Sequence, residues 1–279
     1  MRRLACLLAA AALAGCANHP GANTRRASDL ARAADAAGEN VPPFARAAYA
    51  PFSRADAVAI ALREWRLWGM PVDDDPPDSR PAPTLEQKPE RAPGLWQRVG
   101  EYWWTGQDAS NPDASWTGKH DQNGLEFTND GNYAWSAAFI SYIMRIAGAG
   151  GRFPYSPTHS DYINAARDVS LARSGVYAIS AEALDVYAPR LGDLICLGRG
   201  SSQALTYADL PTRRAFPSHC DIVVGVAPGQ LSVIGGNVDD SVTMKHVPVT
   251  ADGHLSPPGG PPLDTRFSWL TVLRVHYDR

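Results

Sequence analysis

The chain has 279 residues, of which 44% are hydrophobic and 20% are charged, and its formal net charge is −3. This weakly acidic balance excludes a nucleic-acid-binding function, which needs a basic footprint. After residue 15, no apolar run is long enough to cross a bilayer as a helix. The length suits one domain of ordinary size with an N-terminal extension.

The first fifteen residues have the pattern of a secretory signal peptide. Two arginines precede an almost entirely apolar stretch, residues 4–13, and small residues then lead to Cys16. The sequence Leu13-Ala14-Gly15-Cys16 resembles the lipobox of bacterial lipoproteins. That resemblance implies cleavage before Cys16, acylation of this residue and attachment to a membrane through its lipid. The alternative is an ordinary signal peptide with a chance cysteine.

The segment that follows the expected cleavage site is small and polar. Cleavage would remove two of the 26 basic residues and none of the 29 acidic ones, so the mature chain is more acidic. Residues 16–28 are predicted to be a tether from the membrane. Ala17 follows the cysteine instead of an aspartate. By resemblance to lipoprotein sorting in enterobacteria, this implies the outer membrane, with the protein facing the periplasm.

Residues 29–93 are predicted to form a helical extension and a proline-rich linker. Apolar residues at helical spacing predict a helix over Ser53–Met70, with Ser53 as its cap and Gly69 as its stop. Residues 71–93 then carry three consecutive aspartates and several prolines with few apolar residues, which is typical of a linker or a long surface loop. We therefore expect a domain boundary in this stretch and a second domain over 94–279.

The first half of the expected domain is helical. An aromatic cluster lies in Gly94–Gly106, a polar loop is expected over 104–132, and loops of that length are often functional. The strongest helix signal is an apolar stripe from Trp135 to Ile146, which ends before Gly148. A further helix is predicted over Ser160–Val169.

From Leu191 the pattern changes to short strands separated by turns. Strands are predicted over 193–197, 219–226, 231–234, 242–249 and 269–277. Helices followed by strands predict an α+β domain whose antiparallel sheet curls towards a barrel.

Four short motifs follow one another in a defined order along these elements. They are Trp135-Ser136-Ala137-Ala138-Phe139-Ile140-Ser141, Gly192-Asp193-Leu194, Ser218-His219-Cys220-Asp221-Ile222-Val223-Val224 and Gly235-Gly236-Asn237. Over roughly residues 130–245 this order resembles the papain-like cell-wall peptidases of the NlpC and CHAP type. The whole chain more closely resembles the bacterial family called domain of unknown function 2272. The peptidase resemblance implies a papain-like α+β fold, a helix packed on the sheet, and peptidoglycan or a cell-wall peptide as the partner.

The catalytic residues implied by this resemblance are Ser136, His219 and Asn237, as nucleophile, base and orienting residue. The sequence departs from the peptidases at one point, because Ser136 stands where they carry a nucleophilic cysteine. A serine hydroxyl does not ionise at rest and needs a base within hydrogen-bond reach. Two alternatives therefore stay open: an amidase or peptidase with a serine nucleophile, and an inactive module that binds peptidoglycan or an envelope partner.

Four further residues are candidates for contacts with a substrate. Asp221 shares a strand face with His219 and would shift its pKa, the alternative being a salt bridge at the sheet edge. His159 precedes a helix, and a surface histidine that caps a loop is the favoured interpretation. Trp104 belongs to an aromatic cluster that would stack on sugars or form core, and Trp135 begins the nucleophile helix.

Two cysteines remain after the expected signal and anchor, Cys196 and Cys220. They have no CxxC or histidine-rich spacing, so we expect no metal site and no cofactor. An oxidising compartment favours a disulfide between them if their strands pair, the alternative being two buried thiols.

Overall fold

The computed structural model describes residues 51–77, 79, 81, 83–106, 134–172 and 175–278. These residues belong to one compact unit, Ala50–Arg279. The expected signal peptide, the Cys16 anchor, the tether and most of the loop predicted over 104–132 lie outside the described residues. No helix of the part that is described is long and apolar enough to cross a membrane.

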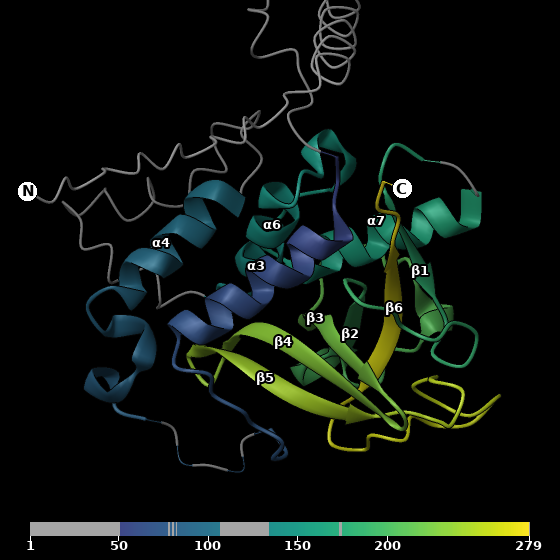
Figure 1. The fold of residues 1–279 in the computed structure, drawn as a ribbon. Coiled ribbons are helices and arrows are strands. Elements are labelled where there is room, and N and C mark those ends of the chain that lie inside the picture. Colours follow the sequence, from purple (N-terminus) through teal and green to yellow (C-terminus); the bar gives the residue numbers. More distant parts are fainter. Residues whose placement is uncertain are drawn as a thin grey trace, which may run out of the picture. The chain divides into compact units, whose positions relative to one another are not determined.

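Four α-helices form one layer of the described unit (Figure 1). They are α3 (Arg54–Leu67), α4 (Leu95–Gly106), α6 (Ser136–Ile146) and α7 (His159–Ala172). Short 3-10 helices lie at Leu85–Gln87, Pro89–Arg91, Gly150–Arg152, Gly200–Ser202 and Tyr207–Asp209. The predicted cap of the first helix is confirmed, because the Ser53 side chain accepts a hydrogen bond from the Asp56 backbone N–H at 3.2 Å.

Helix α3 is part of the same unit as the sheet, in contrast to the expected domain boundary at 71–93. Its buried residues Ala57 and Ala61 belong to the same core as α6 and the strands. Its buried Glu64 accepts two hydrogen bonds from Arg98 of α4, at 2.6 and 3.0 Å. The described residues of 71–89 do lie at the surface, as their composition indicates. Glu90 is fully buried, however, and burial of the α3 face decides the boundary.

Six strands form a single antiparallel sheet with the order β1-β6-β2-β3-β4-β5. The strands are β1 (Ile179–Glu182), β2 (Leu194–Gly198), β3 (Ser218–Ala227), β4 (Gln230–Val238), β5 (Ser241–Pro248) and β6 (Trp269–Val275). Five of them were predicted, and the edge strand β1 was not. The two outer strands, β1 and β5, do not pair with each other, so the sheet stays open and the expectation of a barrel is wrong.

The core has two parts, because apolar side chains project from both faces of the sheet. The larger part joins the sheet to the helices, with α6 packed on β3 and β4. The smaller part gathers Ile195, Val223, Val233, Val247 and Val272 on the other side, beneath partly buried residues such as Phe267. In Figure 1 the helices gather on one side of the sheet. The central strands are therefore covered on both faces, which allows polar residues on them to be fully buried.

Candidate functional site

The candidate site begins at the N-terminus of α6. Ser136 is the first residue of this helix and is 5% exposed. Trp135 occupies the N-cap position and makes no side-chain capping hydrogen bond. The first hydrogen bond of the helix runs from the backbone N–H of Phe139 to the Trp135 carbonyl. The backbone N–H groups of the residues before Phe139 lie ahead of this bond and have no acceptor within the helix. The helix start therefore presents N–H donors next to the serine hydroxyl.

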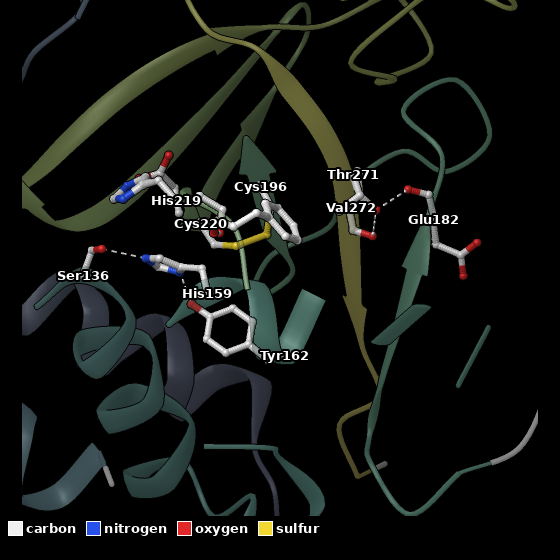
Figure 2. The surroundings of a disulfide bond; sticks show 12 residues. Ser136, His159, Tyr162, Glu182, Cys196, His219, Cys220, Thr271 and Val272 are labelled. Carbon is white, nitrogen blue, oxygen red and sulfur yellow. Dashed lines mark hydrogen bonds and ion pairs between the residues drawn. A yellow bond between two sulfur atoms is a disulfide. The ribbon is translucent and has the colours of Figure 1, made fainter. Parts of the chain in front are cut away.

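The hydroxyl of Ser136 pairs with a histidine from another helix. Ser136 Oγ lies 2.6 Å from His159 Nε2, and the Nδ1 atom of the same ring bonds to the hydroxyl of Tyr162. Figure 2 shows these side chains directed towards one another. His159 is the first residue of α7 and is only 4% exposed, so the interpretation as a surface histidine is wrong. Its burial depends on how α7 packs against β1 and β3 and reaches the start of α6, which local sequence does not reveal.

A second polar group is formed by residues of the interior strand β3 and the outer strand β5. His219 Nε2 donates a hydrogen bond to Asp221 Oδ1 at 2.9 Å, and Lys245 Nζ of β5 lies 2.8 Å from Asp221 Oδ2. All three residues are at most 3% exposed. Asp221 therefore does share a strand face with His219, as predicted, and its salt bridge joins the interior strand β3 to Lys245 of the outer strand β5.

Burial and charge act in opposite directions in this second group. Burial alone would raise the pKa of Asp221, but Lys245 and His219 outweigh it and hold that pKa far below the usual range. Burial lowers the pKa of His219, an effect that Asp221 opposes and Lys245 reinforces. The pKa of His159 is also lowered, by burial and then by the neighbouring His219. Both imidazoles are thus held neutral, the form that accepts protons.

The two polar groups meet at their histidine rings. The ring centroids of His159 and His219 are 5.2 Å apart. Since a carboxylate only accepts, the hydrogen of neutral His219 is on Nε2, and Nδ1 carries a lone pair. This Nδ1 atom is buried and has no hydrogen-bond partner among the residues that the structure describes.

A cavity of about 390 Å³ lies beside this second group. Its polar lining residues include Asp73, Asp75, Arg199, Gln203, His219, Asn237, Asp239, Lys245, Arg266 and Ser268. Of the residues described, neither Ser136 nor His159 belongs to the lining. The cavity is rich in charge of both signs and reaches the site through His219.

Asn237 is not the orienting partner of His219 in this structure. Its Nδ2 atom donates to Glu90 Oε2 at 3.2 Å, whereas Asp221 holds the His219 ring. The physical reason is a break in the β4–β5 pairing between Gly235 and Val238, where Asn237 adopts a φ of 56°. Such a bulge turns a side chain away from the regular strand alternation.

The two tryptophans expected at a substrate surface have different environments. Trp135 is fully buried, stacks on Trp68 and donates from Nε1 to Glu90 Oε2 at 2.7 Å, so it is a core residue. Trp104 on α4 is 70% exposed and does not line the cavity. The neighbouring residues Tyr102 and Trp103 are buried, which agrees with the core interpretation of that cluster.

A disulfide joins Cys196 of β2 to Cys220 of β3 (Figure 2). The two cysteines are directly opposite each other in the β2–β3 pairing, and both are fully buried in the core shared with the helices. Cys220 is adjacent to His219 in sequence, and alternation directs the two side chains to opposite faces. The bridge therefore holds β2 against the strand that carries His219 and Asp221.

The glycine pair of the fourth motif clears space for the site. A Cβ atom on Gly235 would lie 2.1 Å from Asp221 Oδ1 and 2.7 Å from His219 Nε2. A Cβ atom on Gly236 would lie 2.6 Å from the Cβ of Phe139 in α6. β4 can therefore approach both the histidine–aspartate pair and helix α6 only because these two side chains are absent.

Three residues of the site were not predicted from the sequence. Lys245 and Glu90 come from separate parts of the chain, and only the fold brings them to Asp221 and Asn237. Tyr162 had a usable signal, since it follows His159 by three residues on a helix, a spacing that puts side chains on one face. No group of three or more metal-ligating side chains occurs in the described part of the chain.

Together these features define an α+β protein with an open antiparallel sheet and a buried serine–histidine pair at a helix start. Residues 90–275 match the family described as "Uncharacterized protein conserved in bacteria (DUF2272)", and the chain belongs to that family. The predicted family membership is thus confirmed, whereas the papain-like resemblance stays a prediction. No curated protein and no solved structure matches the chain.

Proposed function

We propose that this protein is a serine hydrolase that cleaves amide bonds in cell-wall peptides, with Ser136 as nucleophile and His159 as general base. The observation that carries the proposal is the 2.6 Å contact between Ser136 Oγ and His159 Nε2. A serine needs such a base within hydrogen-bond reach. Tyr162 at the other ring nitrogen acts as the orienting group, the third member of a nucleophile–base–orienter set.

The acylation step uses these atoms in order. With Nδ1–H donating to the Tyr162 oxygen, His159 Nε2 accepts the hydroxyl proton of Ser136 while Oγ attacks the amide carbonyl carbon. His159 then gives that proton to the leaving amine, and an ester on Ser136 remains. The N–H donors at the start of α6 would stabilise the developing oxyanion, since no capping side chain of Trp135 occupies them.

The location and the substrate class of the proposal rest on the sequence. The lipobox resemblance at Cys16 supports a lipoprotein of the outer membrane that faces the periplasm, where peptidoglycan is at hand. The peptidase resemblance of the four motifs supports an amide bond in a cell-wall peptide as the substrate. The proposed reaction uses only side chains and backbone groups of this chain.

A second candidate function has its own supporting observation. Ser136 is 5% exposed, and the cavity next to His219 is not lined by it. A module that binds peptidoglycan or an envelope partner through this cavity, without cleaving it, would need no exposed nucleophile. In that case the Ser136–His159 pair would be a satisfied polar contact of the interior.

A zymogram with purified peptidoglycan embedded in the gel separates the two functions. Wild type is expected to clear the gel, and Ser136→Ala should reduce clearing by about a thousandfold or more, because the nucleophile is gone. Ser170→Ala on α7 is the matched control and should clear like wild type. Peptidoglycan binding without clearing by wild type would favour the binding module. Clearing that survives Ser136→Ala unchanged would eliminate the serine hydrolase.

A further inference from the structure

His219 can accept a proton on Nδ1, and the acylation step does not use it. Its Nε2–H is fixed by Asp221 at 2.9 Å, which leaves the lone pair on Nδ1. This atom is buried and has no hydrogen-bond partner in the described residues, and leaving such an atom unpaired costs free energy. Because Asp221 fixes the His219 ring, its unpaired Nδ1 atom is positioned to accept a hydrogen bond from a ligand or a water molecule.

The position of His219 differs from that of His159 in one decisive respect. His219 lines the cavity of about 390 Å³, where water and a substrate can enter, whereas His159 does not. Both nitrogens of His159 already face protein hydroxyls, Ser136 and Tyr162. The two rings are nevertheless neighbours, 5.2 Å apart between centroids, so His219 lies close to the serine–histidine pair.

We propose that the two histidines divide the reaction, with His159 serving acylation and His219 acting as the general base that activates water for deacylation. This inference rests on the proposed hydrolase function and names the residue for its second half. Lys245 contributes by pairing with the second oxygen of Asp221, 2.8 Å away. Asp221, paired with Lys245, orients the His219 ring through its Nε2–H. The Nδ1 atom of the ring is left without a proton.

In the deacylation step, water cleaves the ester on Ser136. One proton of water moves to His219 Nδ1 while the water oxygen bonds to the acyl carbon. The ester bond to Ser136 Oγ then breaks, the second water proton goes to that oxygen, and a carboxylate leaves. His219 finally gives its proton to solvent in the cavity. Serine, both histidines and the cavity return to their starting state, and one water is consumed.

Acetylation by p-nitrophenyl acetate tests this division of roles. In His219→Gln we expect a burst of about one equivalent of p-nitrophenol and an intact mass that retains one acetyl group. Acetyl loss from the isolated adduct should be about a hundredfold slower than in wild type, the low end for a general base. His159→Gln should show no burst, and the matched control His254→Gln should behave like wild type.

A second variant separates a chemical from a structural role for His219. The acetyl-enzyme of His219→Ala is isolated by gel filtration, and its decay is followed by intact mass with and without added imidazole. Faster decay with imidazole supports the base role, because the cavity admits the missing ring. The inference is overturned if folded His219→Gln deacetylates at the wild-type rate, or if it fails to acetylate while wild type does. Absence of any acetyl-enzyme and any turnover in wild type overturns the proposed function, and this inference falls with it.

Discussion

At the scale of single residues, the His219–Asp221 pair depends on the absence of a side chain at Gly235. Gly235 lies against the His219–Asp221 pair, where a Cβ atom would be 2.1 Å from Asp221 Oδ1. Both side chains are buried and already fixed by the 2.9 Å bond between them, so neither is free to move aside. A methyl group here must shift the pair or the strand.

Gly235→Ala is therefore expected to lower stability by about 1–3 kcal/mol, the usual range for overpacking, and to lower hydrolytic activity. Denaturant unfolding and gel clearing on the same preparation measure the two effects. Gly151→Ala is the matched control, because a Cβ there meets nothing within 4 Å, and it should change neither quantity. A Gly235→Ala protein as stable and as active as wild type would show that the site is not packed as described.

Residue types alone predicted part of the site. The positions of Ser136 at a helix start and of Asp221 beside His219 follow from local patterns, helix spacing and strand alternation. The partners could not be predicted, because they depend on long-range packing. His159 is buried only when α7 packs on the sheet and reaches Ser136, and Asn237 faces Glu90 only because the β4 bulge turns it.

At the scale of elements, a buried ion pair ties α3 to α4. Glu64 is fully buried and accepts two hydrogen bonds from Arg98 and one from the Tyr102 hydroxyl at 2.7 Å. A carboxylate in this position depends on its partners, since removing one leaves an uncompensated charge in the core.

Arg98→Met should consequently destabilise the protein by about 3–5 kcal/mol, measured by denaturant unfolding. Arg63→Met is the matched control, because Arg63 is 63% exposed and lies 3.7 Å from the same carboxylate. Its effect should stay within about 0.5 kcal/mol. Equal stability of the Arg98→Met and wild-type proteins would contradict the account of α3 as part of the domain.

The disulfide between β2 and β3 supplies a second test at this scale. Cys196 and Cys220 are 24 residues apart in sequence, and the chain-entropy model gives a bridge of this span roughly 3 kcal/mol. Unfolding with and without reductant should differ by about that amount. Protein purified without reductant should be lighter than its reduced form by two hydrogens. Quantitative alkylation of both thiols without reductant would rule the bridge out.

At the scale of the whole molecule, the sequence predicted the α+β class and five of the six strands. β1 was missed because four residues at an edge carry too short a pattern for recognition. The barrel was wrong because closure depends on how the outer strands lie, and β1 and β5 remain separate edges. The boundary at 71–93 was misplaced because a polar surface segment looks like a linker whether or not its flanks pack together.

The elements that carry the candidate site lie within the region that matches the family. Residues 90–275 carry the family match, and they include α6, α7 and every strand that positions Ser136, His159 and His219. Helix α3 precedes the matched region yet belongs to the same core. A protein used for activity measurements should therefore contain the whole unit Ala50–Arg279.

The most direct test of the central claim is covalent labelling by a fluorophosphonate, which reacts with a serine only when a base activates it. We predict one label per chain, located on Ser136 by peptide mass measurement. Labelling should be abolished in Ser136→Ala, slowed by at least about a hundredfold in His159→Gln, and retained in His219→Gln. No label on Ser136 in folded wild type, or wild-type labelling of His159→Gln, would contradict the account.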